Sequence, residues 1–221
     1  MKLSVIITGV TGMVGEGVLH EALLHPDVER VLVLTRRPNG MSHPKLSEIV
    51  VKDFYDLSDI ESQLAGYNAC FFCLGVSSIG MKEADYRHIT YDLTMSVARS
   101  LSKMNPDMTF SYISGKATDS TEHGRLMWAR VKGKTENDLM KLPFKKVYAF
   151  RPGILLPTKG MKNTLKYYKY ITWLNPLLRI VFPSSVSTLE ALGLSMINIT
   201  VNGYPTPVIE VNDIVASAKG A

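Results

Sequence analysis

The sequence predicts an α/β protein with a doubly wound parallel sheet. Short apolar runs alternate with longer segments of helical period, in the order βαβαβ. The runs are almost wholly apolar instead of alternating with polar residues, which is typical of strands that are covered on both faces. With 221 residues, of which 46% are hydrophobic and 20% charged, the chain can bury a substantial core. We therefore predict a single domain over residues 1–221.

Six runs are predicted as strands because they are short, apolar and rich in residues that favour strands. They occupy residues 3–7, 30–34, 48–51, 69–74, 109–113 and 146–150.

Four helical segments lie among these strands. The first covers residues 13–25 and is ended by Pro26. Ser58 and Glu61 form a capping-box pattern that opens a short helix ending at Gly66. The third helix has one apolar face, formed by Ile89, Leu93, Val97 and Leu101 at four-residue spacing, and the fourth covers residues 126–142.

After Pro152 the regular alternation ends. Prolines, glycines and aromatic residues interrupt it, so we predict that residues 153–207 form a small irregular lid at the carboxyl edge of the sheet, on the substrate side. In this lid lysines interleave with aromatic residues ahead of residues 174–182. We favour a helix whose aromatics cover the substrate pocket over contact with a membrane surface or a partner groove. The residues concerned are Lys162, Lys166, Lys169, Tyr167, Tyr168, Tyr170 and Trp173.

Composition excludes several classes of function. The net charge of +5, from 25 basic and 20 acidic residues, is too dilute for a nucleic-acid-binding surface. Two cysteines cannot form a disulfide framework, which indicates a reduced compartment, and we predict a cytoplasmic location. No apolar segment reaches the length of a spanning helix. No metal site is predicted, because the histidines have no ligand spacing with one another or with cysteine: His20, His25, His43, His88 and His123.

The turn between the first strand and the first helix carries the clearest motif. Its glycines, Gly9, Gly12 and Gly15, have the spacing G-x-x-G-x-x-G. Such glycines permit a tight turn and bring the backbone close to a pyrophosphate at the helix N-terminus. We predict that this turn binds a dinucleotide cofactor through Gly9, Thr11, Gly12, Met13, Val14 and Gly15.

The end of the second strand bears on the choice of cofactor. An acidic residue about 20 positions after the glycines would accept the ribose hydroxyls of NAD. The sequence has Arg36 and Arg37 instead. Because a guanidinium can pair with a 2′-phosphate, we favour NADP(H) over NAD(H).

Two further turns are predicted to contact the cofactor. Asp53 can accept from the adenine amino group and Phe54 can cover the ring. Cys73, Leu74 and Gly75 end the fourth strand, where the glycine lets the backbone pass close to a ribose. Cys70 and Cys73 form a C-x-x-C pattern, but inside a strand they point to opposite faces, so we interpret both as core residues without redox chemistry.

These motifs, taken in order, resemble an atypical short-chain dehydrogenase/reductase over essentially the full chain. The resemblance implies an NAD(P)-binding Rossmann fold of the epimerase/dehydratase kind, and it adds Lys132, Arg151 and Gly153 to the cofactor site. The runs that carry it are residues 8–15, Arg36-Arg37, Lys52-Asp53-Phe54, Phe72-Cys73-Leu74-Gly75, Val131-Lys132-Gly133-Lys134 and Phe150-Arg151-Pro152-Gly153.

The resemblance also implies catalytic positions. The family's Tyr-x-x-x-Lys pair corresponds here to Trp128 and Lys132. An indole N–H does not exchange its proton near neutral pH, so the usual general acid is missing. The partner serine corresponds to Ser114 or to Gly115, and the spacing does not decide between them. Other proton donors are Tyr91, Ser120, Thr121 and the lid tyrosines.

Two functions therefore stay open. In the first, which we favour because the tyrosine is missing, the protein is an NADP(H)-binding sensor or scaffold that engages a protein partner. The alternative is an NADPH-dependent reductase or an epimerase-like enzyme that acts on a small carbonyl substrate.

Overall fold

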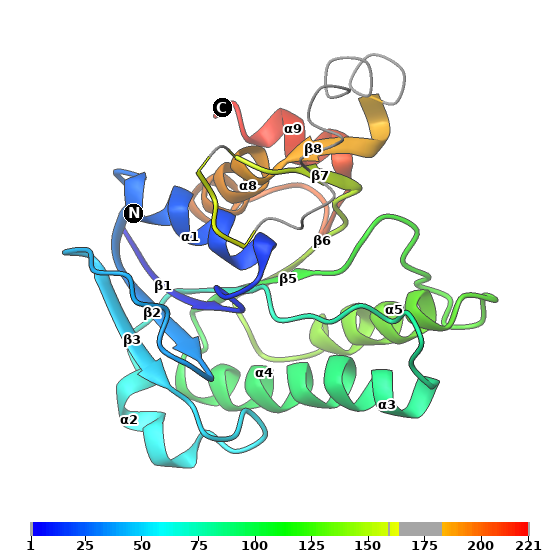
Figure 1. The fold of residues 1–221 in the computed structure, drawn as a ribbon, viewed down its shortest axis with the longest axis horizontal. Helices are drawn as coiled ribbons and strands as arrows, with labels where there is room; N and C mark the ends of the chain where they lie inside the picture. The colour runs from blue at the N-terminus through cyan, green and yellow to red at the C-terminus, as the bar shows by residue number, and fades with distance from the viewer. Residues whose placement is uncertain (1, 159, 164–182, 221) are drawn as a thin grey trace.

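The computed structural model describes residues 2–158, 160–163 and 183–220, and it confirms the predicted α/β fold (Figure 1). Within these residues, seven parallel strands form one sheet in the order β3-β2-β1-β4-β5-β6-β9. The order reverses direction at β1, as in a doubly wound sheet. The strands are β1 (Leu3–Thr8), β2 (Val28–Thr35), β3 (Leu46–Val50), β4 (Ala69–Phe72), β5 (Thr109–Ile113), β6 (Lys146–Phe150) and β9 (Val208–Ile209).

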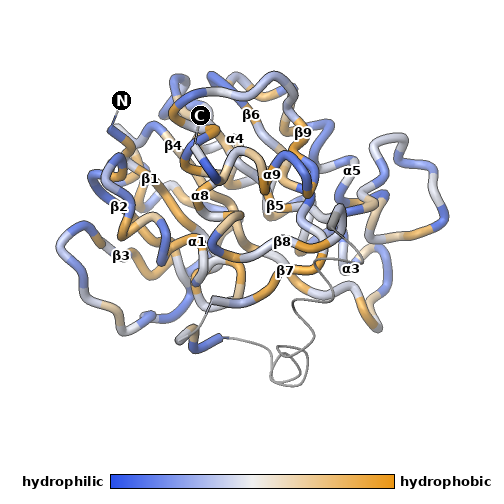
Figure 2. Tube along the Cα trace, turned by 90° about the horizontal axis from the view of Figure 1, so that it is seen from above, coloured by the Kyte–Doolittle hydropathy of each residue, from blue (hydrophilic) through white to orange (hydrophobic). Residues whose placement is uncertain are grey.

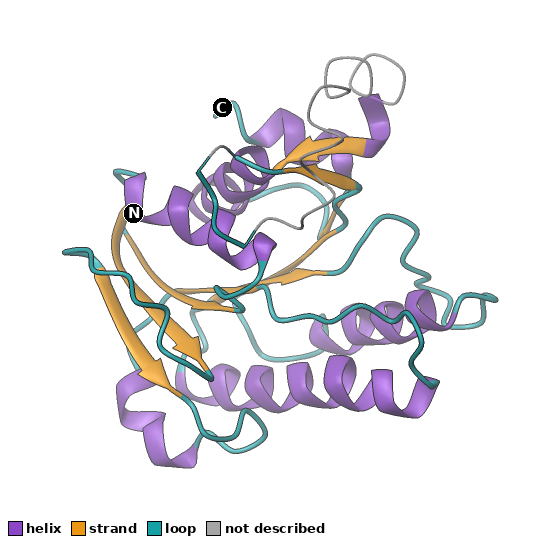
Figure 3. Ribbon diagram, in the orientation of Figure 1, coloured by secondary structure: helices purple, strands orange, loops and turns teal. Residues whose placement is uncertain are grey.

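Helices cover both faces of this sheet (Figures 1 and 3). On one face α1 (Met13–Leu24) and α8 (Leu189–Asn202) pack side by side, and on the other lie α4 (Leu93–Met104) and α5 (Met127–Leu139). Each face has its own buried apolar cluster. Figure 2 shows that the strands are hydrophobic and that the outer loops are hydrophilic. Shorter helices are α2 (Glu61–Leu64), α3 (Glu83–Arg87) and α9 (Val211–Ser217).

The six predicted strands are all present, with small changes at their ends. The fourth strand stops at Phe72 instead of Leu74, and the backbone N–H of Cys73 donates to Thr8 Oγ1 at 3.2 Å. Cys73 therefore lies beyond the strand, and its predicted place inside the strand is wrong. The seventh strand, β9, escaped prediction because two residues are too few to show a pattern.

The predicted capping box at Ser58 is wrong. Ser58 lies inside a 3₁₀ helix (Ser58–Ile60) that precedes α2, and its side chain caps neither helix. Its backbone N–H instead donates to Asp56 Oδ1 at 3.0 Å. A capping box is present at α9, where Glu210 and Asp213 exchange side-chain and backbone hydrogen bonds.

The predicted helix with an apolar stripe is interrupted by a π-helical turn (His88–Asp92) between α3 and α4. A π turn takes more residues than an α turn, so it rotates the residues before it relative to those after it. Ile89 is therefore 37% exposed, whereas Val97 and Leu101 are fully buried.

The segment after Pro152 is more regular than predicted. Strands β7 (Ile154–Leu156) and β8 (Val186–Thr188) form a second, two-stranded parallel sheet, and a 3₁₀ helix (Pro183–Ser185) precedes β8. Helix α8 has 14 residues and packs on α1, where a Cβ on Gly17 would lie 2.8 Å from Cβ of Leu189. The limits of the lid stay a prediction, and its tyrosines, Trp173 and residues 174–182 lie outside the described residues.

None of the helices in the described ranges is long and apolar enough to cross a membrane.

Candidate functional site

The glycines of the first turn have different structural roles. Gly9 has a φ of 73°, and a Cβ there would lie 2.5 Å from the carbonyl oxygen of Cys73. A Cβ on Gly15 would collide with the carbonyl of Gly9. The fold itself thus requires glycine at both positions.

Gly12 differs from the other two. It has extended backbone angles, φ −102° and ψ 162°, at the N-terminus of α1. The nearest atom to a Cβ there would be Gly9 O, at 3.4 Å, which is an ordinary contact. The fold therefore does not require a glycine at residue 12, whereas a ligand that lies against the helix N-terminus would.

The predicted arginines lie beside this turn. A cavity of about 650 Å³ opens between the turn and the end of β2, and no carboxylate lines it. Arg36 and Arg37 are exposed, and no hydrogen bond or ion pair among the described residues uses either guanidinium. Thr35 Oγ1 donates to Arg37 O at 2.8 Å, which holds the strand end in place. The lining residues are Gly9, Thr11, Leu34, Thr35, Arg36, Arg37, Pro38, Phe54 and Leu74.

Each of the two other predicted turns contributes one residue to the lining of this cavity. Phe54 is 4% exposed and lines the cavity, as does Leu74. Asp53 is exposed, and its Oδ1 accepts from the backbone N–H of Tyr55 at 2.8 Å. A Cβ on Gly75 would have no neighbouring atom within 4 Å. The backbone at Gly75 is thus open to a ligand.

Burial keeps both thiols protonated. It raises the pKa of Cys70 well above its usual value, and that of Cys73 to about 12. Both cysteines are free, and Cys70 is fully buried. A protonated thiol is a poor nucleophile, which fits a packing role.

Lys132 and Trp128 lie on α5, beside the end of β5. The ammonium of Lys132 donates to the backbone oxygen of Ser114 at 2.6 Å and to that of Ile113 at 3.3 Å. Burial lowers the pKa of Lys132 to about 8, although the neighbouring Glu136 carboxylate acts in the opposite direction. A half-buried lysine with a pKa near 8 can hold or release a proton close to neutral pH.

The two candidates for the serine position face different ways. Ser114 is 7% exposed, and its hydroxyl donates to Phe150 O at 3.1 Å. At Gly115, a Cβ would lie 3.9 Å from Cζ3 of Trp128. A side chain at residue 115 would therefore meet the indole, whereas the hydroxyl of Ser114 is bonded to β6.

Two of the other predicted proton donors give their protons to carboxylates. The hydroxyl of Tyr91 donates to Asp138 at 2.7 Å, and that of Thr121 donates to Asp119 at 2.6 Å. Ser120 Oγ accepts from Arg151 at 2.6 Å. The lid tyrosines lie outside the described residues.

Arg151 and Gly153 occupy structural positions. Arg151 pairs with the buried carboxylate of Glu136 and with Glu210, and so joins β6 to α5 and α9. A Cβ on Gly153 would collide with the carbonyl of Ser185. Contacts of either residue with a cofactor stay a prediction.

One contact near the turn escaped sequence reasoning. Glu16, in the first turn of α1, accepts from the backbone N–H groups of Lys162 and Asn163, each at 2.7 Å. These residues line a second cavity, of about 460 Å³, which shares Thr11 and Pro38 with the first. Acidic residues are common in a first helical turn, so nothing local indicates a contact with a segment 146 positions away.

Within the described part of the chain, no three His, Cys, Asp or Glu side chains lie together as a metal site would require.

Comparison with known proteins places this site in a family. The model of the NAD dependent epimerase/dehydratase family matches residues 5–126. Protein FMP52-1, mitochondrial, from Scheffersomyces stipitis is 26% identical over 169 residues, covering 74% of each chain. Protein HTATIP2 from Rattus norvegicus is 26% identical over 155 residues, covering 69% of this chain and 63% of that protein.

Solved structures support the fold. WbmG from Bordetella bronchiseptica, in complex with NAD, has a TM-score of 0.68 at 13% identity and covers all of this chain and 79% of that one. A UDP-N-acetylglucosamine 4-epimerase from Methanobrevibacter ruminantium has a TM-score of 0.68 at 16% identity, and the match covers 98% of this chain and 81% of that one. At these identities the likeness concerns the fold alone.

The predicted cytoplasmic location is contradicted by the relatives. Several fungal proteins that match the chain are named as mitochondrial. The prediction was wrong because it was drawn from cysteine content. The absence of a disulfide framework indicates a reducing compartment, but it does not distinguish the cytosol from other reducing compartments.

The family model covers more than half of the 221 residues, including the glycine turn and the end of β4. The match to rat HTATIP2 and to the FMP52 proteins confirms the predicted atypical branch, which we associate with the Tat-interacting protein. The chain belongs to the NAD dependent epimerase/dehydratase family, within an atypical branch of the short-chain dehydrogenases/reductases.

Proposed function

We propose that the protein binds NADP(H) in preference to NAD(H), at the cavity between the glycine turn and the end of β2. The observation that carries this proposal is the charge of that cavity: its lining includes Arg36 and Arg37 and no carboxylate. A carboxylate at this strand end is what selects the ribose hydroxyls of NAD, whereas an unpaired guanidinium suits a 2′-phosphate.

The residues present fit a dinucleotide. The space beside Gly12, which the fold leaves free, accepts a pyrophosphate at the N-terminus of α1. Phe54 and Leu74 line the cavity and provide apolar surface for the adenine. The assignment of Lys132 to the nicotinamide ribose rests on the family's Tyr-x-x-x-Lys pattern. When bound, the nicotinamide ring gives or takes a hydride.

Calorimetric titration of the full chain with NADPH and with NADH tests this preference. We expect NADPH to bind about 10- to 100-fold more tightly, because one hydrogen bond to a charged group contributes roughly 1.5–3 kcal/mol. Replacing both Arg36 and Arg37 by alanine should remove the difference. Lys52→Ala, which removes a positive charge outside the cavity lining, is the matched control. Equal affinities in the unaltered protein would refute the proposal.

The protein acts as a cofactor-binding sensor or scaffold for a partner protein. This part of the proposal rests on Trp128, which holds the position of the family's tyrosine and cannot give a proton near neutral pH. The hydroxyls of Tyr91 and Thr121, which could replace it, donate their protons to Asp138 and Asp119. Gly115, which faces the indole, offers no hydroxyl either.

The second candidate function is NADPH-dependent reduction of a small carbonyl compound, or an epimerase-like reaction. The pKa of Lys132 favours it, because a half-buried lysine with a pKa of about 8 can itself donate a proton. In that role Lys132 would supply the proton that the family's tyrosine otherwise gives.

Trp128→Tyr distinguishes the two candidates. A phenol four residues before Lys132 lies on the same helix face, and general acid catalysis contributes about 10²–10⁴-fold. If the pocket is a reductase pocket without its acid, NADPH-dependent turnover of small aldehydes and ketones should rise. If the protein only binds cofactor, turnover stays at background while NADPH still raises the melting temperature. Brisk activity of the unaltered protein that Trp128→Tyr abolishes would refute the sensor role.

A further inference from the structure

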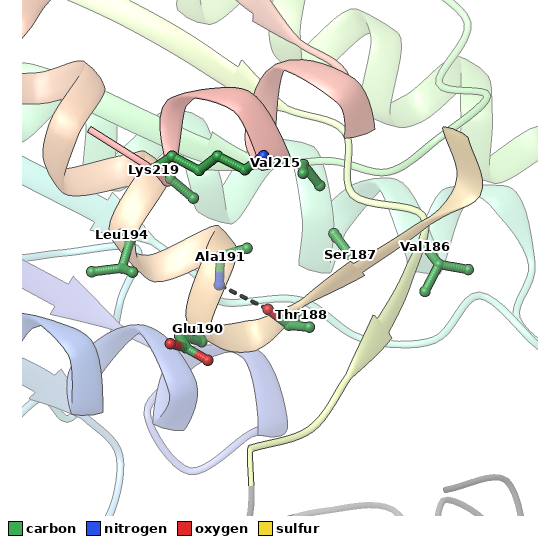
Figure 4. A pocket seen from close by; sticks show the side chains of 9 residues that line it. Val186, Ser187, Thr188, Glu190, Ala191, Leu194, Val215 and Lys219 are labelled. Carbon is green, nitrogen blue, oxygen red and sulfur yellow. Dashed lines mark hydrogen bonds between the residues drawn. The ribbon is translucent and has the colours of Figure 1, made fainter. Parts of the chain in front are cut away.

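A third cavity, of about 460 Å³, lies between β8, α8 and α9 (Figure 4). Its lining is mostly apolar, and it shares no lining residue with the two cavities at the glycine turn. The hydroxyl of Thr188 in this lining already has a partner, because it accepts from the backbone N–H of Ala191 and so caps α8. The described lining therefore specifies no ligand, whereas the carboxyl edge of β4 and β5 does.

Two bare stretches of backbone lie at that edge. Strands β4 and β5 pair in parallel, with Phe72 opposite Tyr112. Gly75 and Gly115 each follow this pair by three residues, so both glycines lie at the same edge of the sheet. Among the described residues, a Cβ on Gly75 would have no neighbouring atom within 4 Å, and a Cβ on Gly115 would have only Cζ3 of Trp128, at 3.9 Å. The backbone is thus open at both positions, and the indole of Trp128 borders the opening.

The order of the strands determines which half of a dinucleotide reaches this opening. The arginine-lined cavity lies at the end of β2, on one side of β1, whereas β4 and then β5 lie on the other side. A dinucleotide crosses a doubly wound sheet at the point where the strand order reverses, with its pyrophosphate at the first helix. With the adenosine half at β2, the nicotinamide half therefore lies over β4 and β5, beside Trp128.

The nicotinamide ring differs in charge between the two forms of the cofactor. The oxidised ring is a pyridinium cation, whereas the reduced ring is an uncharged dihydropyridine. The face of an aromatic ring attracts a cation within about 6 Å, and tryptophan does so more strongly than tyrosine or phenylalanine. Trp128 is half-buried, so part of its indole is available to a ligand.

Lys132 is a cation that opposes this attraction. It lies one turn after Trp128 on α5, and an ammonium repels a pyridinium. Its protons are directed at two carbonyl oxygens, those of Ile113 at 3.3 Å and Ser114 at 2.6 Å. The negative ends of these carbonyl dipoles offset part of the ammonium charge, and the indole has no such partner among the described residues.

We propose that Trp128 is a specificity-determining residue that favours the oxidised cofactor, because its indole attracts the pyridinium ring of NADP⁺ and not the neutral ring of NADPH. This inference rests on the proposed cofactor site, but it concerns the opposite end of the dinucleotide from the arginines. It gives the sensor role a physical basis, since the bound form then follows the ratio of oxidised to reduced cofactor.

Calorimetric titration of the full chain with NADP⁺ and with NADPH tests the preference. Trp128→Leu should lower the ratio of the NADP⁺ affinity to the NADPH affinity by about 3- to 30-fold, and Trp128→Phe should lower it less. Tyr67→Leu is the matched control. It removes an aromatic ring that also lies under a cation, Arg30, but ahead of β4 at the opposite edge of the sheet, so the ratio should not change.

Absorption and fluorescence spectra test the contact itself. Trp173→Phe leaves Trp128 as the only tryptophan of the chain. An indole in contact with a pyridinium gives a charge-transfer absorption band at longer wavelength than either group alone, and its emission is quenched. We expect both signals on addition of NADP⁺. Adenosine 2′,5′-bisphosphate, which has only the adenosine half, should compete with NADP⁺ and give neither signal.

The two cofactor proposals can fail separately. The 2′-phosphate preference is measured by NADPH against NADH, and the present inference by NADP⁺ against NADPH, or by NAD⁺ against NADH if those bind more tightly. The inference is overturned if a folded Trp128→Leu protein keeps the affinity ratio, or if NADP⁺ binds without the charge-transfer band. If Trp128→Leu does not fold, Trp128→Phe and the spectra of the Trp173→Phe protein decide. A chain that binds none of these dinucleotides overturns both proposals.

Discussion

Replacing Gly12 and Gly15 separates what the fold needs from what the cofactor needs. A Cβ on Gly15 would meet the backbone of Gly9 and Val10, so Gly15→Ala is an overpacking change that costs about 1–3 kcal/mol. In a domain of this size that lowers the melting temperature by roughly 2–12 °C. At Gly12 the nearest atom would be 3.4 Å from the Cβ, and the backbone angles suit any residue. Gly12→Ala is therefore expected to change the free energy of unfolding by less than about 1 kcal/mol.

Cofactor binding should respond in the opposite way. Gly12→Val places a branched side chain where the pyrophosphate lies against α1, and the loss of a hydrogen bond to a charged group weakens binding about 10- to 100-fold or more. Thermal denaturation followed by circular dichroism measures the fold, and calorimetric titration with NADPH measures binding. A folded Gly12→Val protein that binds NADPH with unchanged affinity would show that the turn only joins a strand to a helix. A Gly15→Ala protein as stable as the original would refute the packing argument.

Three further predictions concern α5 and its neighbours. Because the pKa of Lys132 falls to about 8 in the folded state, the unfolded chain binds more protons between about pH 8 and 10.5, and the free energy of unfolding should rise with pH across that window. Lys132→Met should lose this rise, as measured by urea denaturation at pH 7 to 10.5. Glu136→Ala should destabilise the protein by about 3 kcal/mol in the same assay, because it removes the buried carboxylate that pairs with Arg151 and leaves that guanidinium only the partly exposed Glu210 and the hydroxyl of Ser120. Glu83→Ala, at an exposed ion pair with Arg130, should cost less than about 1 kcal/mol. Lys134→Met should make the protein less resistant to acid, because the ammonium of Lys134 is one of the groups that hold the pKa of Asp138 below its usual value. In an acid titration followed by circular dichroism, the variant should unfold at a higher pH than the original protein. An unchanged acid transition would contradict this prediction.

The sheet, the glycine turn and the arginines at the end of β2 could all be predicted from the amino-acid sequence. These features are local: an apolar run of five or six residues, a glycine spacing and a strand-end residue can each be recognised without knowledge of the rest of the chain. The replacement of the family's tyrosine by Trp128 could also be recognised from the sequence, because Trp128 and Lys132 are four residues apart in one helix.

Features that depend on distant segments became known only from the folded chain. The three glycines look alike in sequence, and it is the backbone of Cys73 and of Gly9 that makes two of them structural and leaves Gly12 free. The π turn before α4 rotates Ile89 away from the apolar stripe of that helix, and four-residue spacing in the sequence does not distinguish a π turn from an α turn. The opening beside Trp128 arises only because the pairing of β4 with β5 brings Gly75 and Gly115 to one edge of the sheet, and residues so far apart in the sequence form no local pattern.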